Sequence, residues 1–198
     1  MMIKTFLVAL AMISAAGLTE ASGQSQKPLE VVPSVDLSRY SGTWFEIARL
    51  PNSFQKDCVS DVSATYTVLD KGEIKVLNQC RKKNGNLKQV EGKARPSGKD
   101  KPNTKLEVRF APSLFSFLPM VWGDYWIIDI APDYTYAVIG EPGRKYLWIL
   151  SRYAKMDEET YQKILSKVAA QGYDTSKIVR TKQGPGAGDQ GPVKEGIQ

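Results

Sequence analysis

The 198-residue sequence contains no histidine and only two cysteines, Cys58 and Cys80. Histidine is the commonest general base and a frequent metal ligand, so its absence removes the Ser-His and Cys-His nucleophile pairs and most zinc sites. The sequence also lacks a glycine-rich phosphate loop and a cysteine cluster with metal-ligand spacing. We therefore expect no catalytic residue, no metal and no cofactor.

Long hydrophobic runs are also missing after the first residues of the chain. No later segment reaches the length of about 18 apolar residues that a transmembrane helix needs. Residues 1–23 combine a positive start, a short apolar stretch and small residues, which is the pattern of a cleaved secretory signal peptide. An uncleaved membrane anchor is the alternative. No cysteine lies near this segment, so the lipid-modified N-terminus of a bacterial lipoprotein is not available.

The expected organisation is a signal peptide over 1–23, one domain over 28–181, and a disordered tail over 182–198 that is rich in glycine, proline, glutamine and charge. A signal peptide implies a periplasmic or secreted protein. Because export leads to an oxidising compartment, Cys58 and Cys80 are most simply a disulfide, with two free buried thiols as the alternative.

Charge of one sign is not concentrated anywhere. The formal net charge is +6, but the basic residues do not form a stripe. This pattern argues against nucleic acid as a partner and leaves only a weak attraction to anionic surfaces.

Short β-like runs separated by turn residues fill the middle of the chain, which is typical of an all-β barrel or sandwich. Asp157 is placed to cap a helix that runs to Ala170, and a short extra strand is possible over 177–181. Because the connections are short, neighbouring strands should be antiparallel. The eight expected strands are 43–49, 59–69, 73–81, 87–95, 104–111, 124–130, 135–140 and 145–152.

The fifth expected strand alternates between apolar and charged residues, which predicts one buried face and one face in water. The apolar set is Leu106, Val108 and Phe110, and the charged set is Lys105, Glu107 and Arg109.

Three short motifs in order resemble the signatures of the lipocalin family. Gly42–Glu46 reads Gly-Thr-Trp-Phe-Glu, Asp124–Trp126 precedes Asp133–Tyr136, and Tyr146–Arg152 ends in an arginine. The resemblance extends over about 31–181 and is strong for the bacterial lipocalins and apolipoprotein D. It implies an eight-stranded antiparallel up-and-down β-barrel with one C-terminal helix packed outside. Such a barrel is either filled by side chains or holds one small ligand.

The signature residues Gly42, Trp44 and Arg152 are interpreted as structural. Trp44 begins the first strand and Arg152 ends the last, so closing the barrel brings them together. A guanidinium over an indole face is worth roughly 0.5 to 2 kcal/mol and would plug the narrow end.

Side chains alternate between the two faces of a strand. If Arg152 points into the barrel, the alternate residues Leu150, Trp148 and Tyr146 should do so as well. By the same rule, an inward Trp44 implies that Glu46 and Ala48 point inward. The resemblance to apolipoprotein D implies that Tyr66, Asn78 and Tyr125 also line the pocket. For each residue, ordinary barrel core is the alternative. The expected ligand-binding residues are Tyr66, Asn78, Val108, Phe110, Tyr125 and Trp148. The family resemblance implies a small hydrophobic ligand such as a fatty acid or lysophospholipid. Envelope maintenance, lipid salvage and transfer of lipid between membranes are all compatible roles.

An apolar loop over 114–122 joins the fifth and sixth strands, which lipocalin topology places at the open mouth. It either forms a rim that touches a membrane surface or a second subunit, or folds inward as a lid. The rim residues would be Phe115, Phe117, Leu118 and Trp122. A monomer and a homodimer both remain open.

Two rival classes are considered. In a lipocalin-fold enzyme acting on a lipid, the carboxylates Glu46, Asp124 and Asp129 could in principle pair inside the barrel; a structural or gating role is the alternative. An outer-membrane barrel would need a polar lumen, whereas the fifth strand offers an apolar face for a greasy interior.

Overall fold

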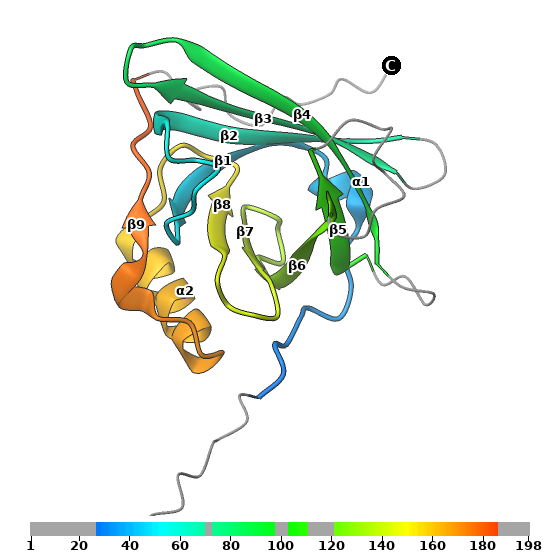
Figure 1. Cartoon of the computed structure of the whole chain (residues 1–198). Helices are drawn as coiled ribbons and strands as arrows, with labels where there is room; N and C mark the ends of the chain where they lie inside the picture. Colours follow the sequence, from blue (N-terminus) through cyan, green and yellow to red (C-terminus); the bar gives the residue numbers. More distant parts are fainter. Residues whose placement is uncertain (1–26, 70–72, 98–102, 111–120, 186–198) are drawn as a thin grey trace, which may run out of the picture.

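Eight antiparallel strands close into a barrel in the computed structural model of the chain (Figure 1). The structure describes residues 27–69, 73–97, 103–110 and 121–185. Each strand pairs with the next, and β1 pairs with both β2 and β8 to complete the ring. The strands are β1 (Gly42–Arg49), β2 (Cys58–Val68), β3 (Ile74–Lys82), β4 (Leu87–Pro96), β5 (Lys105–Arg109), β6 (Gly123–Ile130), β7 (Tyr136–Gly140) and β8 (Leu147–Ser151). The predicted fold class is confirmed, and the predicted strand ends differ by only one or two residues.

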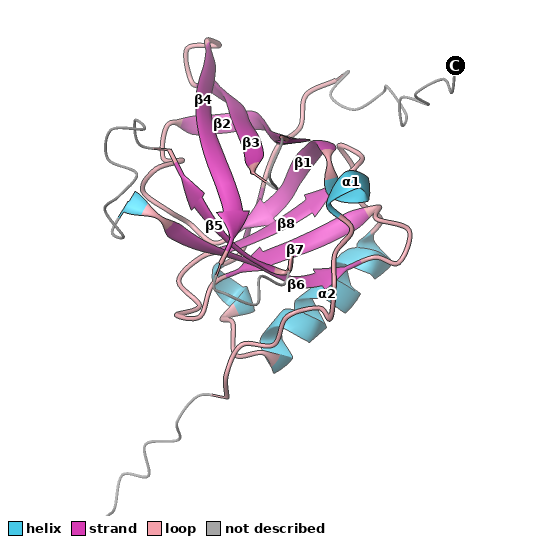
Figure 2. Cartoon of the chain, turned by 90° about the vertical axis from the view of Figure 1, so that its right-hand side faces the viewer, coloured by secondary structure: helices cyan, strands magenta, loops and turns pink. Residues whose placement is uncertain are grey.

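The C-terminal helix α2 (Glu158–Ala170) lies against the outside of the barrel (Figure 2). Asp157 caps it as predicted, because its Oδ1 accepts a hydrogen bond from the backbone N of Thr160 at 2.8 Å. The buried stripe of Tyr161, Ile164 and Val168 packs with apolar residues on the outer face of the barrel. No helix in the described ranges has both the length and the apolar character needed to cross a bilayer.

A β-bulge in β1 corrects the prediction for Ala48. Glu46 pairs with Leu150, but the next register partner, Ile149, pairs with Ala48, so Ile47 is the extra residue. An extra residue reverses the side-chain alternation that follows it. Glu46 therefore lines the barrel interior as expected, whereas Ala48 packs in the outer cluster under α2.

The narrow end of the barrel is closed as the signature residues predict. The Arg152 guanidinium lies 3.8 Å from the centroid of the fully buried Trp44 ring. It also donates to the backbone oxygens of Thr43, Arg39 and Ser41 at 2.9, 2.6 and 2.8 Å.

Two observations explain why the residue at position 42 is a glycine. Its φ of +94° lies in the left-handed region, and a Cβ there would stand 3.3 Å from Nη1 of Arg152.

A short helix α1 (Leu37–Tyr40), which the sequence did not predict, completes the closed end. Its N-cap Asp36 accepts from the backbone N of Ser38 at 2.8 Å. The indole Nε1 of Trp44 donates to the carbonyl of Tyr40 at 2.7 Å. The helix therefore supplies the acceptor that the buried indole needs.

The chain returns to the barrel after α2. A 3₁₀ turn over Thr175–Lys177 leads into β9 (Val179–Arg180), which pairs with β1. The described chain keeps packing on the barrel beyond our predicted boundary at Thr181. Gln183 Nε2 donates to the carbonyls of Glu46 and Val62 at 2.8 and 2.9 Å, so it ties β1 to β2. Residues 1–26 and 186–198 lie outside the described residues.

Candidate ligand-binding site

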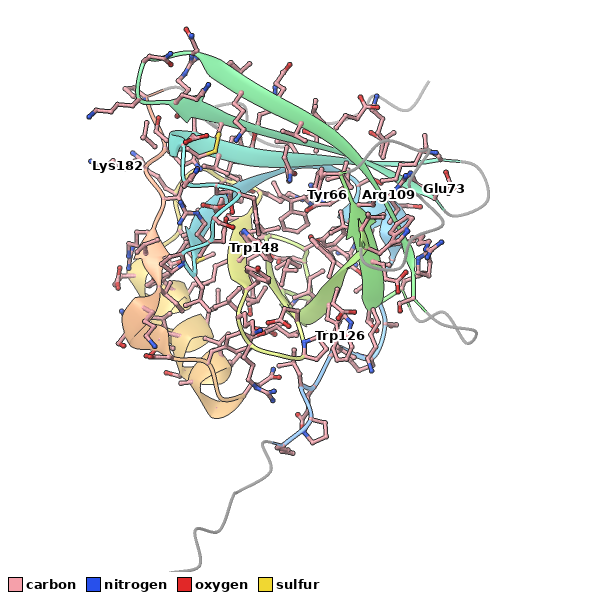
Figure 3. All side chains as sticks on the ribbon, viewed as in Figure 1. Tyr66, Glu73, Arg109, Trp126, Trp148 and Lys182 are labelled. Atoms are coloured by element: carbon pink, nitrogen blue, oxygen red, sulfur yellow. A yellow bond between two sulfur atoms is a disulfide. The ribbon has the colours of Figure 1, made fainter. Side chains whose placement is uncertain are left out.

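A cavity of about 780 Å³ occupies the end of the barrel opposite α1. The connections β1–β2 and β7–β8 border its mouth, and side chains from most barrel strands form its wall. Figure 3 shows Tyr66 and Trp148 within the ring of strands. The structure brings all six predicted ligand-binding residues to this wall: Tyr66, Asn78, Val108, Phe110, Tyr125 and Trp148.

One side of the mouth is a cluster of three aromatic rings. Trp148 lies 6.0 Å from both Phe54 and Tyr146, measured between ring centroids, and Phe54 lies 5.5 Å from Tyr146. Phe54 is 52% exposed and Tyr146 is 36% exposed, so a large apolar surface faces the opening. Such a surface suits an apolar ligand at the entrance.

Behind this cluster, Gln55 connects Trp148 to a buried carboxylate. Gln55 Oε1 accepts from the indole Nε1 of Trp148 at 2.9 Å, and its Nε2 donates to Glu46 Oε2 at 2.7 Å. Thr181 donates its hydroxyl to the other carboxylate oxygen, and Arg49 Nε lies 3.3 Å from that oxygen. Glu46 thus has polar partners on both oxygens although it is only 2% exposed.

The carboxyl of Glu46 is electrostatically unusual. Burial raises its pKa above the ordinary value of 4.5, and the hydrogen bonds from Thr181 and Gln55 and the charge of Arg49 offset only part of that rise. The enclosed carboxyl of Glu46 is therefore a polar group in the wall of the cavity.

Three tyrosines form a hydrogen-bonded chain at the floor of the cavity. The hydroxyl of Tyr125 lies 2.7 Å from that of Tyr40 and 2.8 Å from that of Tyr66. All three residues are buried, and burial raises the pKa of Tyr66 to about 12 and those of Tyr40 and Tyr125 well above 10.0. The phenols are therefore neutral at physiological pH.

The fifth strand departs from its predicted alternation. Leu106 is buried as expected, but Arg109, on the face expected to meet water, is also buried, and Phe110 is 40% exposed. The guanidinium of Arg109 lies 5.1 Å from the ring centroid of Trp122, which covers it.

Phe110 reaches the cavity wall because Gly92 leaves room for it. A Cβ on Gly92 would stand 2.6 Å from Cδ1 of the Phe110 ring.

Of the four predicted rim residues, only Trp122 lies within the described part of the chain. Its ring is half-buried rather than exposed, and the Arg95 guanidinium lies 3.9 Å from its centroid. Trp122 also borders the cavity. The other three, Phe115, Phe117 and Leu118, lie outside the described residues.

The predicted disulfide is confirmed. Cys58 and Cys80 are bonded, with 5.5 Å between their Cα atoms, and they link β2 to β3 beside the mouth. The bond fastens two strands at the hollow end of the barrel.

The three carboxylates that could in principle pair inside the barrel do not gather in one place. Glu46 and Asp124 border the cavity, but Asp129 lies 2.8 Å from Lys167 of the outer helix α2. Among the described residues, no group of three histidine, cysteine or acidic side chains is placed to hold a metal ion.

Sequence reasoning missed Gln55, Tyr40 and Gly92. Gln55 follows the first strand in an irregular connection, where no periodicity indicates orientation. Tyr40 lies two residues before the glycine of the first motif, but its side chain is placed by α1, which is too short to leave a hydrophobic pattern. Gly92 interrupts a strand pattern, which is a signal for a close approach.

An eight-stranded up-and-down barrel, plugged by a tryptophan and an arginine at one end and hollow at the other, defines a lipocalin. The sequence model of the lipocalin-like domain family matches residues 35–183. The chain therefore belongs to the lipocalin family, whose members bind small hydrophobic ligands.

Curated relatives span most of the chain. Temperature-induced lipocalin-1 of Arabidopsis thaliana is 44% identical over 80% of this chain and 84% of its own length. The outer membrane lipoprotein Blc of Citrobacter freundii is 35% identical over 91% of this chain and 98% of its own. Apolipoprotein D of Rattus norvegicus is 35% identical over 77% of this chain and 79% of its own.

Solved structures support the fold alone. Insecticyanin from the tobacco hornworm Manduca sexta superposes with a TM-score of 0.63 at 22% identity, over 82% of this chain and 88% of its own. Apocrustacyanin C2 superposes with a TM-score of 0.60 at 20% identity, over 76% of this chain and 81% of its own.

Proposed function

We propose that this lipocalin is exported and carries one lipid-like molecule in its barrel. The observation that carries this proposal is the cavity of about 780 Å³ with an aromatic mouth and an apolar wall. Burying a methylene group is worth roughly 0.8 kcal/mol, so a chain of about 14 to 18 carbons gains on the order of 10 kcal/mol before the costs of ordering. Few specific contacts are needed, and selectivity among such ligands should be loose.

The proposed ligand is a fatty acid, a lysophospholipid or a similar amphipathic lipid. We assign its contacts to the six wall residues Tyr66, Asn78, Val108, Phe110, Tyr125 and Trp148. The proposed roles are envelope maintenance or lipid salvage, and transient contact of the mouth with a membrane surface would serve loading. We propose a binding role rather than catalysis, because the buried carboxylate of Glu46 is already engaged by Gln55, Thr181 and Arg49.

Residues 1–23 have the pattern of a cleaved signal peptide, which supports a periplasmic or secreted location. The confirmed disulfide is consistent with an oxidising compartment.

Native mass spectrometry of the protein purified from a bacterial host that expresses the full chain tests the proposal. A mass lacking about 23 N-terminal residues would support export with cleavage. An additional lipid mass, one per chain, that collisional activation releases would support the carrier role. A mature protein with no adduct and no saturable binding of a fluorescent fatty acid would contradict it.

Two tryptophan variants locate the site. Trp148→Ala is expected to weaken fatty-acid binding at least tenfold, because the cavity wall loses an indole ring at the mouth. Trp126→Ala is the matched control, since Trp126 does not border the cavity and instead lies with its ring centroid 4.3 Å from Lys105 Nζ. Equal losses in both variants would place binding elsewhere.

A further inference from the structure

The three tyrosine hydroxyl groups at the cavity floor carry one more hydrogen than the hydrogen bonds between them use. Tyr40, Tyr125 and Tyr66 together carry three hydroxyl hydrogens, and the two bonds between them consume two. Within the part of the chain that the structure describes, these hydroxyl groups make no other hydrogen bond. One O–H is left to find its acceptor elsewhere: that of Tyr40, that of Tyr66, or that of Tyr125 if Tyr125 accepts from both neighbours.

The two ends of the chain differ in what they face. Tyr40 is 1% exposed, does not border the cavity, and packs against the Trp44 ring with 5.0 Å between centroids. Tyr66 borders the cavity. A spare hydrogen on Tyr40 would point into packed apolar surroundings, whereas a spare hydrogen on Tyr66 meets whatever fills the barrel. Because an unpaired buried donor is costly, Tyr40 is expected to donate to Tyr125, which leaves the spare hydrogen on Tyr66 or Tyr125, and both of these border the cavity.

The charge of the floor restricts the acceptor. The phenols stay protonated at physiological pH, because burial raises the pKa of Tyr66 to about 12 and those of Tyr40 and Tyr125 well above 10.0. The nearby cation, Arg152, is already committed to three backbone carbonyls and to the Trp44 ring. An ionised carboxylate pushed to this depth would be desolvated without a counter-charge. A neutral oxygen needs none.

We infer that the floor of the barrel is a recognition site for a neutral hydrogen-bond acceptor, such as a ketone, ester or ether oxygen at the inner end of an apolar ligand. The inference rests on the proposed carrier function and adds a chemical requirement to it. Ligands that carry such an oxygen at the buried end are bound more tightly than hydrocarbon ends of the same shape. Any ionised head group stays at the mouth.

Competition against the neutral fluorescent probe N-phenyl-1-naphthylamine tests this in the full-length protein. The matched competitors are methyl undecyl ketone and the isosteric branched alkane in which a methyl group replaces the carbonyl oxygen. One net hydrogen bond predicts that the ketone binds roughly two- to tenfold more tightly than the alkane. Equal affinities would overturn the inference and leave the carrier function standing. Failure of the probe and both competitors to bind would overturn both.

Phenylalanine variants identify the hydroxyls that act. Tyr66→Phe/Tyr125→Phe removes the two hydroxyls of the tyrosine chain that border the cavity while keeping the rings, so the preference for the ketone should disappear and alkane affinity should persist. Tyr40→Phe removes a phenol from the far end, leaves the chain from Tyr125 to Tyr66, and should keep most of the preference. A double variant that still prefers the ketone would overturn the inference.

Infrared spectroscopy needs no variant. The carbonyl stretch of the bound ketone should lie at lower frequency than in an alkane solvent, because a phenol donates to it. A frequency equal to that in the alkane would also overturn the inference.

Discussion

The two ends of the barrel are built by the same strands but differ in how they are filled. At the closed end Trp44 and Tyr40 are almost fully buried and pack against each other in one cluster. At the open end Phe54 and Tyr146 keep 52% and 36% of their surface exposed around a cavity. The difference teaches that stability and binding are assigned to separate halves: the closed half and the outer face under α2 hold the fold, and the open half is left free for a ligand.

Tryptophan truncation at each end is the strongest way to break this comparison. Trp44→Ala should lower the free energy of unfolding by about 3 to 5 kcal/mol, because it empties a fully packed site and leaves Arg152 without the ring beneath it. Trp148→Ala should cost about 1 kcal/mol, since its ring is only half-buried and borders a cavity. Denaturant unfolding of both variants measures this, and similar losses would show that the open half is also part of the stabilising core.

The disulfide is the feature that gives the open half a share in stability. Cys58→Ala/Cys80→Ala should lower the free energy of unfolding by about 3 kcal/mol, because the bond closes a loop with a sequence separation of 22 residues in the unfolded chain. Denaturant unfolding under non-reducing conditions, with fatty-acid titration alongside, separates the two roles. If stability is unchanged but binding is lost, the bond shapes the mouth rather than restraining the unfolded state.

Removing the N-cap of α2 tests how much the helix on the outer face of the barrel adds to stability, and the expected loss is smaller. Asp157→Ala should cost about 1 kcal/mol, because the backbone N of Thr160 loses its acceptor in the first turn of α2. Glu159→Ala in the same turn is the control and should change stability by less than about 0.5 kcal/mol, since its pair with Lys163 is exposed. Thermal melts followed by circular dichroism distinguish them, and equal shifts would argue that the cap is dispensable.

The smallest expected effect is a change in how stability depends on pH, and it concerns the buried carboxyl of Glu46. Burial raises the pKa of the folded-state Glu46 carboxyl above 4.5, so its stabilising contribution is full below that pH and is lost as the pH rises through the folded pKa. Glu46→Gln should abolish this part of the decline, which denaturant unfolding at a series of pH values measures. A variant whose stability falls with pH in parallel with the wild type would contradict the assignment.

The sequence predicted the strands because each one alternates or carries β-branched residues, and it predicted the closed end because Gly42, Trp44 and Arg152 form a recognisable set. It placed Ala48 on the wrong face, because the bulge at Ile47 depends on how β1 meets β8 and leaves no local pattern. It missed the burial of Arg109, whose guanidinium lies 5.1 Å from the ring of Trp122 beside the neighbouring strand β6. Local periodicity therefore determines the wall of the site, whereas the loops and short helices that finish it are decided by tertiary contacts.

The direct pairing of β1 with β2 is reinforced by residues from much later in the chain. Gln183 bonds the carbonyls of both strands, and Thr181 reaches the carboxylate of Glu46. During synthesis the first strand therefore waits for nearly the whole domain before its last partners exist. Contacts of such large sequence separation slow folding, so the emerging chain spends a long time with unpaired strand edges. The ring of strands closes where β1 meets β8, and the bonds from Gln183 are among the last contacts that can be added to it.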